Sequence, residues 1–346
     1  MTPKICIIIL NWNRRDDTLE CLKSVYALDY RNFEVILVDN GSTDDSVSAI
    51  RLLFPQAILI KNRENLGYTG GNNVGMRYAL EQGADYFWLL NNDTVVRPDT
   101  LSRLVEAGEK EQAVGLLSPS IYYYDEPDNV QFIGAYVDTD NLAVIPVTSA
   151  EQLEEVRRAK NLVLYGTAVL IKRAVIEAIG VLPEEYFAYH EDCHFSLKAL
   201  EHNFETAVVL DAPILHKESR TTAKLSPVQV FLRCRNIYFL CSDNCHGFRR
   251  NIQLASRYIS NMLSYAGYLF DEGKEESSNA CITGVWSALT GKGGGFNPNG
   301  GAPLWFKAPF KMCMLWHPGF WTNVFRGNMS AVLHQLLVRV HVRQPG

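Results

Sequence analysis

Short apolar runs alternate with amphipathic stretches through the first 120 residues of the chain. Continuous apolar runs of strand length are typical of buried strands, and apolar positions three and four apart are typical of helices. Strands that are apolar throughout and alternate with helices form parallel sheets covered on both faces. The pattern therefore predicts an α/β fold with a mostly parallel sheet flanked by helices. The predicted strands are 4–10, 33–39, 57–61, 85–93 and 113–119, and the predicted helices are 16–28, 43–54 (with Thr43 as N-cap), 71–83 and 97–110.

The pattern changes after residue 120. An aromatic, turn-rich stretch at 121–147 favours hairpins, and the chain after residue 226 is expected to be helical up to a glycine cluster at 291–301. We therefore divide the chain into three regions, with a helical C-terminal extension as the last. The further elements expected are a core strand at 161–173, a helix over the HEDCH motif, a strand at 205–211 and a helix at 226–244, and the regions are 1–120, 121–225 and 226–346.

Composition places the chain among ordinary globular proteins, with 47% hydrophobic and 21% charged residues. No run of 18 or more apolar residues occurs, so no spanning helix is expected. The N-terminus lacks a small-residue cleavage site and is interpreted as a first buried strand rather than a signal peptide. The eight cysteines are scattered without a CxxC pair, which favours reduced thiols and a cytoplasmic location.

Charge is distributed unevenly along the chain. The last 70 residues contain six Lys and Arg and no Asp or Glu, interleaved with Trp and Phe side chains. Basic residues among aromatic ones suit an anionic bilayer surface. We therefore expect a cytoplasmic protein that associates with the inner face of the cell membrane. The competing interpretation is a helical appendage whose aromatic side chains pack on the main domain. Nucleic acid is not an expected partner, because the net charge is −5.

Four predicted strands end in polar residues or are followed by them. Ligands of open α/β sheets bind beyond the carboxyl ends of the strands, so these residues are expected to share one site. The glycine-rich stretch after the third strand would let backbone N–H groups approach an anion, and Asp93 is placed to hold a hard cation. Each group alone is also compatible with a turn or a cap. The candidates are Asn11, Trp12 and Asn13; Asp39; Asn65, Gly67, Gly70, Gly71 and Asn72; and Asn91, Asn92 and Asp93.

The stretch YFAYHEDCHFSLKAL allows two interpretations. His190 and His194 are four residues apart and on a helix would share one face, as in HExxH zinc peptidases. Alternatively, Glu191 and Asp192 form an acid pair that supplies a catalytic base. The longer zinc motif is absent, since residues 197 and 200 are both Leu.

The segments IIILNWNR, VILVDNGSTDDS, NLGYTGGNNVGM and LLNNDTVV resemble family 2 glycosyltransferases of the GT-A fold, which is Rossmann-like. They are most similar to the bacterial rhamnosyltransferase-like branch, and the resemblance covers about residues 4–245. It implies an inverting transfer that depends on Mg²⁺ or Mn²⁺ and uses a pyrimidine-diphosphate sugar, dTDP-L-rhamnose or alternatively a UDP-hexose. The implied acceptor is a growing surface-polysaccharide or lipid-linked glycan.

The resemblance also implies a role for each matched position. Residues 1–120 would bind the nucleotide sugar, with Asn11, Trp12 and Asn13 beside the base and Asp39 accepting a pyrimidine N3–H. Residues 121–225 would bind the acceptor and carry the base, Asp192, with Glu191 beside it. Asp93 and His216 would hold the metal. The remaining positions, which would line the nucleotide and sugar, are Asn65, Gly67, Gly70, Gly71, Asn72, Asn91 and Asn92.

The sequence departs from the family pattern at three positions. Asn91 replaces the first acid of the DxD motif, as is usual in this branch, while His194 and Lys198 replace an Asp and an Arg. The zinc peptidase interpretation leaves the N-terminal half of the chain unexplained and becomes a remote alternative. A third hypothesis is an inactive scaffold that binds a nucleotide sugar, although Asp39, Asp93 and Asp192 are all retained.

Overall fold

The computed structural model describes residues 2–217, 226–243, 247–297 and 301–314. Much of the basic aromatic tail on which the membrane interpretation rests, including Trp316, Phe320, Trp321 and Phe325, lies outside these residues. The chain divides into two compact units, Met1–Thr222 and Ala223–Gly346. Each is described by itself.

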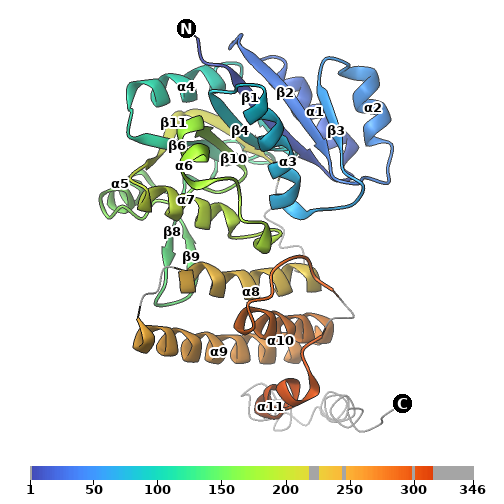
Figure 1. The fold of residues 1–346 in the computed structure, drawn as a ribbon, viewed down its shortest axis with the longest axis vertical. Coiled ribbons are helices and arrows are strands. Elements are labelled where there is room, and N and C mark those ends of the chain that lie inside the picture. The colour runs from blue at the N-terminus through green and yellow to red at the C-terminus, as the bar shows by residue number, and fades with distance from the viewer. Residues whose placement is uncertain (1, 218–225, 244–246, 298–300, 315–346) are drawn as a thin grey trace. The chain divides into compact units, whose positions relative to one another are not determined.

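The first unit contains a nine-stranded sheet with helices on both faces (Figure 1). The strand order is β3-β2-β1-β4-β10-β6-β11-β5, with β7 paired to β6. The elements are β1 Ile5–Asn11, α1 Arg15–Val25, β2 Phe33–Asp39, α2 Ser46–Leu53, β3 Ile58–Lys61, α3 Gly67–Glu81, β4 Tyr86–Asn91, β5 Thr94–Val96, α4 Thr100–Lys110, β6 Val114–Tyr123, β7 Val130–Phe132, β8 Ala135–Asp138, β9 Ala143–Pro146, α5 Ala150–Arg158, β10 Ala168–Lys172, α6 Arg173–Ile179, a 3₁₀ turn at Glu184–Tyr186, α7 Glu191–Glu201 and β11 Glu205–His216.

The sheet is mostly parallel, as the sequence predicts. Strands β3, β2, β1 and β4 are parallel neighbours, and β11 is parallel to β6. Strand β10 runs antiparallel to both β4 and β6, and β5 runs antiparallel to β11. The start of β10 therefore lies beside the carboxyl end of β4, and the residues that enter β10 reach the same edge as the residues that leave β4.

Side chains of the central strands alternate between two apolar layers. Ile5, Ile7 and Ile9 are buried in one layer, to which α1 and α4 contribute their apolar faces. Cys6 and Ile8 are buried in the other, to which α3, α6 and α7 contribute. Burial on both faces explains why these strands read as uninterrupted apolar runs.

Several elements differ from those predicted. Helix α2 begins at Ser46 rather than after Thr43, because Asp44 Oδ1 accepts the Ser46 N–H at 3.1 Å. Helix α3 begins at Gly67, so most of the predicted glycine loop is helical. The core strand expected at 161–173 is shorter, at Ala168–Lys172, and helix α5 was not predicted.

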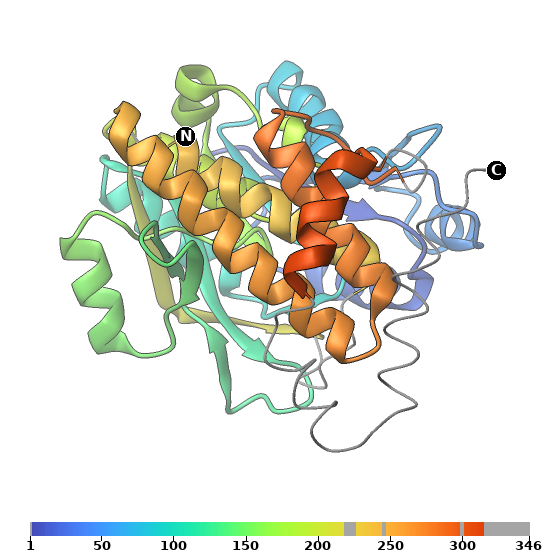
Figure 2. The same cartoon turned by 90° about the horizontal axis from the view of Figure 1, so that it is seen from below.

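The second unit is helical in its described part, which confirms the predicted helical extension. Its helices are α8 Pro227–Asp243, α9 Phe248–Asp271, α10 Glu275–Leu289 and α11 Leu304–Met314, seen side by side in Figure 2. The buried Arg235 donates to Gly294 O at 2.5 Å and ties α8 to the segment after α10. Across the described residues, no helix combines the length and apolar character needed to cross a bilayer.

Candidate active site

The carboxyl ends of β1, β2 and β4 are aligned at one edge of the sheet. In the strand register, Asn11 lies opposite Asp39, and Leu10 lies opposite Asn91. The polar residues that follow three separate apolar runs are therefore neighbours in space. The alignment is the one that the prediction of a shared site assumes.

Asn11 connects the ends of these strands. Its Nδ2 donates to Asp39 Oδ1 at 2.9 Å, and its Oδ1 accepts from Thr18 Oγ1 at 2.7 Å. Asn92 Nδ2 in turn donates to Thr18 Oγ1 at 2.8 Å. Thr18 was not among the sequence candidates, because it lies within a predicted amphipathic helix and belongs to no motif. The network fixes the side chains of Asp39 and Asn92 relative to each other.

Asn40 fixes the segment that leads into α3. Its Nδ2 donates to Asn65 Oδ1 at 2.9 Å and to Gly67 O at 3.0 Å, and its Oδ1 accepts the Leu66 N–H at 3.1 Å. Asn65 Oδ1 also accepts the Gly67 N–H at 2.8 Å. Asn40 stands directly after Asp39 in the DNGS segment, so its position was a signal that could have identified it.

The glycines of the predicted loop are required by close packing. Gly67 has φ +76°, and a Cβ there would lie 2.4 Å from the carbonyl oxygen of Phe187. A Cβ on Gly71 would lie 2.4 Å from Leu10 Cδ1. Gly70 and Asn72 lie in the same turns of α3, and the Asn72 Nδ2 donates to Tyr68 O at 2.9 Å. These residues form the beginning of a helix rather than a free loop, and this part of the interpretation is corrected.

Trp12 and Asn13 follow β1. Trp12 is 53% exposed, while Asp39 is buried at the end of the neighbouring strand. Asn13 and Arg14 both adopt left-handed backbone conformations, with φ 56° and 72°. Asn13 is held by hydrogen bonds, because its N–H donates to Ser42 Oγ at 2.8 Å and its Oδ1 accepts the Thr43 N–H at 2.9 Å. The exposed indole is therefore presented by an ordered turn.

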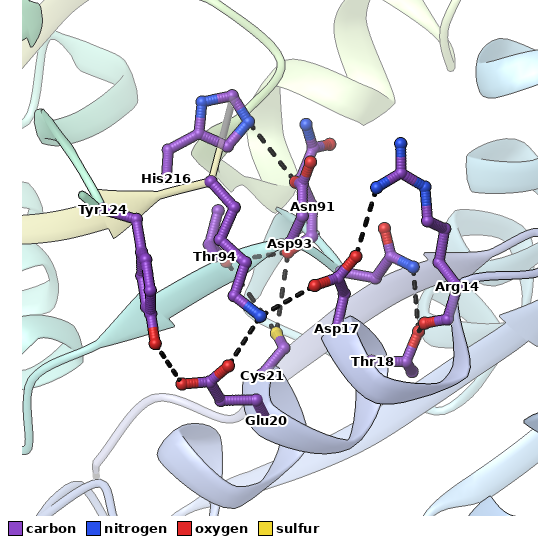
Figure 3. Close-up of polar contacts among 12 residues, drawn as sticks. Arg14, Asp17, Thr18, Glu20, Cys21, Asn91, Asp93, Thr94, Tyr124 and His216 are labelled. Atoms are coloured by element: carbon purple, nitrogen blue, oxygen red, sulfur yellow. Dashed lines mark hydrogen bonds and ion pairs between the residues drawn. The ribbon is translucent and has the colours of Figure 1, made fainter. Parts of the chain in front are cut away.

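Asp93 and His216 face each other across the end of β11 (Figure 3). His216 Nε2 lies 3.3 Å from Asp93 Oδ1, and both side chains are largely buried. Burial would raise the pKa of Asp93, but His216 and a backbone N–H lower it overall. Apart from His216 Nε2, no group in the described part of the chain is a hydrogen-bond partner of Asp93 Oδ1. A largely buried carboxylate beside an imidazole nitrogen fits a pair of ligands for a divalent cation.

A network of charged residues fixes the end of β11 (Figure 3). Lys217 Nζ lies 2.7 Å from Asp17 Oδ1 and 2.6 Å from Glu20 Oε2, so β11 is tied to α1. Tyr124 donates to Glu20 Oε1 at 2.8 Å, and the Lys217 N–H donates to Asp93 O at 3.0 Å. The sequence did not suggest this network, which lies directly beside His216.

Asp192 lies in the first turn of α7, and its carboxylate is held by backbone groups. Gly166 N donates to Oδ2 at 2.7 Å, and Cys193 N donates to Oδ1 at 2.7 Å. Burial raises the pKa of Asp192 above its ordinary value, although the two N–H donors offset part of the rise. Asn91 N donates to Thr167 O at 2.9 Å, so the Gly166 turn adjoins the end of β4. Asp192 is thereby brought to the edge that carries Asp39 and Asp93.

Glu191 differs from its neighbour. It is 4% exposed, and its Oε2 has no hydrogen-bond partner. Burial, and then the negative charge of Asp192, raise the pKa of Glu191 well above its ordinary value. Because Asp192 accepts two N–H donors and Glu191 Oε2 accepts none, the pair favours a protonated Glu191 and an ionised Asp192.

The zinc interpretation of the HEDCH stretch fails on geometry. His190 precedes α7 as its N-cap with φ 71°, so the two histidines are not on successive turns of one helix. His194 Nδ1 lies 3.2 Å from the Tyr186 hydroxyl. No group of three or more His, Cys, Asp or Glu suited to a metal occurs in the part of the chain that the structure describes. Phe187, Tyr189 and His190 all have positive φ, and such strain is common beside active sites.

The nine-stranded, mostly parallel sheet with its flanking helices has the GT-A fold. The fold matches solved GT-A enzymes. The mannosyltransferase PcManGT from Pyrobaculum calidifontis, solved with GDP-Man and Mn²⁺, has a TM-score of 0.53 at 15% identity over 99% of this chain and 89% of that one. TarS from S. aureus, solved with UDP-GlcNAc, has a TM-score of 0.54 at 18% identity over 82% of this chain and 81% of that one.

The chain belongs to glycosyl transferase family 2, whose family model matches residues 6–180. Three relatives are similar at low identity. The hexosyltransferase Agl10 of low-salt glycan biosynthesis in Haloferax volcanii is 26% identical over 70% of this chain and 77% of its own length. The dTDP-rhamnosyl transferase RfbF of Shigella flexneri is 22% identical over 70% of this chain and 82% of its own length. The N-acetylglucosaminyl-diphospho-decaprenol L-rhamnosyltransferase of Mycobacterium tuberculosis is 23% identical over 72% of this chain and 88% of its own length. The resemblance to the rhamnosyltransferase-like branch is thus confirmed.

Proposed function

We propose that this glycosyltransferase is inverting, depends on a divalent cation, and moves L-rhamnose from dTDP-L-rhamnose to a surface-polysaccharide or lipid-linked glycan. The observation that carries the proposal is the shared edge of the sheet. One buried carboxylate there faces an imidazole, and another is held by two N–H donors. These are the groups that a single displacement needs: a cation site for the leaving diphosphate and a base for the acceptor.

The donor is recognised through Trp12 and Asp39. The exposed indole of Trp12 offers a face on which a base can stack, and Asp39 offers a carboxylate oxygen to a pyrimidine N3–H. The names of the Shigella and Mycobacterium relatives support rhamnose as the transferred sugar. A UDP-hexose is the second candidate, because a uracil base presents the same N3–H and Asp39 does not distinguish it from thymine.

The acceptor hydroxyl must lose a proton, and a carboxylate of this chain can take it. Asp192, whose ionised form the Gly166 and Cys193 N–H groups stabilise, removes the proton from the acceptor hydroxyl. The acceptor oxygen bonds to the anomeric carbon as the bond from that carbon to the diphosphate breaks, so the configuration inverts. Glu191, protonated and beside Asp192, adds no second negative charge to the cleft.

Asp93 and His216 would hold the cation, Mg²⁺ or Mn²⁺. When bound, the cation neutralises charge on the departing diphosphate. Carboxylate oxygen ligands suit both ions. Asn91 and Asn92 adjoin this site. Asn92 is already engaged with Thr18, whereas Asn91 contributes its backbone to the contact with Thr167.

Residues 121–225 form the proposed acceptor-binding half. The C-terminal region is proposed to contact the membrane. Leu304 and Trp305 in α11 are 71% and 68% exposed, and Lys307 follows them. An exposed aromatic and aliphatic pair beside a lysine suits the headgroup region of an anionic bilayer. A lipid-linked acceptor would be met at that surface, on the inner face of the cell membrane.

Thermal-shift measurements with a panel of nucleotide sugars, each with and without Mn²⁺, test the donor proposal. We expect dTDP-L-rhamnose to stabilise the protein most and Mn²⁺ to increase the shift. A larger shift with a UDP-hexose would favour the alternative donor. Binding of a pyrimidine-diphosphate sugar, with no sugar transferred to any membrane-derived acceptor, would favour the inactive scaffold.

A further inference from the structure

Gln131 contacts the proposed metal ligand His216 from another strand. Gln131 lies on β7, and His216 ends β11, with β6 between the two strands. The Gln131 Oε1 lies 2.9 Å from His216 Nδ1. The contact joins residues 85 positions apart and belongs to none of the motifs in the sequence.

The contact determines which imidazole nitrogen carries the proton. A carboxamide oxygen can only accept a hydrogen bond, so His216 Nδ1 must donate. In a neutral imidazole, the proton on Nδ1 leaves Nε2 with its lone pair exposed. His216 is buried, so water cannot easily supply a competing partner.

Nε2 faces Asp93. It lies 3.3 Å from Asp93 Oδ1, within ion-pair distance. Because His216 Nδ1 is already engaged with Gln131, Nε2 and Asp93 Oδ1 are the two atoms that would be available to a divalent cation.

We propose that Gln131 is a positioning residue that holds His216 in the Nδ1–H tautomer, so that Nε2 points with Asp93 toward one divalent cation. The proposal rests on the metal-dependent function proposed above. A metal-bound histidine usually donates its other N–H to an oxygen, and loss of such a partner typically weakens metal binding by ~10–100-fold.

Two variants separate the hydrogen bond from the shape of the side chain. Gln131→Met has similar length and lacks the oxygen, whereas Gln131→Glu keeps an acceptor at the same place. Mn²⁺ titrations followed by electron paramagnetic resonance, without donor sugar, measure affinity directly. We expect Gln131→Met to bind Mn²⁺ ~10–100-fold more weakly, and Gln131→Glu to match or exceed the wild type. Wild-type affinity in Gln131→Met, with binding lost in His216→Ala, would overturn the proposal.

A second measurement does not depend on the metal. Long-range ¹H–¹⁵N spectra of ¹⁵N-histidine protein at pH 8, where an ordinary imidazole is neutral, report the tautomer, and His216→Ala assigns the signal. We expect Nδ1–H in the wild type and in Gln131→Glu, and a shift toward Nε2–H in Gln131→Met. An Nε2–H wild-type signal would refute the role of Gln131. Absence of Mn²⁺ binding by a wild type with the Nδ1–H signal would instead refute the metal-dependent function.

Discussion

The backbone N–H of Gly166 donates a 2.7 Å hydrogen bond to Oδ2 of Asp192. Residue 166 has no room for a side chain, because a Cβ there would lie 2.7 Å from the Tyr68 hydroxyl. Tyr68 itself donates to Gly166 O at 2.5 Å, so α3 supports the turn that holds Asp192. Helix α3, which begins at the proposed donor site, and the carboxylate of Asp192, the proposed base, are thus linked through one glycine.

Asp192→Asn is expected to abolish transfer while nucleotide binding is retained. The amide keeps the size of the side chain but cannot accept the acceptor's proton, so turnover should fall by ~10²–10⁴-fold. Initial rates give the loss, and calorimetry with the nucleoside diphosphate and Mn²⁺ gives the affinity. Asp211→Asn, at an exposed carboxylate on β11, serves as the matched control and should keep wild-type turnover. Comparable turnover in both variants would remove Asp192 from its role.

Glu191→Gln is expected to change the pH dependence of stability. A carboxyl with a raised pKa in the folded state stabilises the fold at acid pH and loses that contribution as pH rises toward the raised value. The wild type should therefore lose stability relative to Glu191→Gln between pH 5 and pH 8. Melting temperatures across this range measure the difference. A constant offset between wild type and Glu191→Gln across this range would contradict a protonated Glu191.

Gly67→Ala and Gly83→Ala distinguish packing from backbone strain. The two glycines have φ +76° and +75°, but an added Cβ meets Phe187 O at 2.4 Å only at Gly67 and nothing within 4 Å at Gly83. Both variants should lose ~1–2 kcal/mol from the left-handed backbone. Gly67→Ala should lose ~1–3 kcal/mol more, and should also lose transfer activity as Phe187 moves. Urea unfolding measures the free energy of unfolding of each variant. Equal losses in the two variants would mean that Phe187 moves away from the added Cβ without a cost in stability.

The double variant Leu304→Ser and Trp305→Ser should weaken binding to anionic vesicles. The two side chains are exposed and adjoin Lys307, so their loss removes apolar insertion but leaves the charge. Co-sedimentation with phosphatidylglycerol vesicles, at low and high salt, is the measurement. Leu52→Ser removes a side chain that is 79% exposed on α2 and should leave binding unchanged. If the double variant binds as well as Leu52→Ser does, α11 is not the contact.

The sheet was predictable because its central strands are buried on both faces. Ile5–Asn11 and Phe33–Asp39 were located to within a residue from uninterrupted apolar runs. The direction of Ala168–Lys172 was not predictable, since parallel and antiparallel strands of equal burial share one apolar pattern. The early start of α3 was also missed, because glycine is a poor helix former and here is required by contacts with Leu10 and Phe187.

The candidate site residues that follow apolar strands were predictable from the sequence. Those that act through hydrogen bonds to residues distant in the sequence were not. Asp39 and Asp93 follow apolar runs, and Asp192 lies in a recognisable acid pair. Thr18 and Gln131 have no local signal, because their importance comes from hydrogen bonds to Asn11 and His216, which are distant in sequence. The left-handed backbone at Tyr189 and His190 was also not predictable, since no glycine marks it.

Strand β10 runs antiparallel to β4 and β6, so the pairing of this strand and the position of the loop before it are separate structural requirements. The sheet needs only that Ala168–Lys172 pair with its neighbours, while the loop before it must deliver one N–H to a carboxylate. A residue inserted between Lys160 and Gly166 would therefore move the Gly166 N–H away from Asp192, and it would also disturb the buried side chains of Leu162, Val163 and Leu164. The length of this segment is therefore constrained both by the packing of the core and by the position of the proposed base.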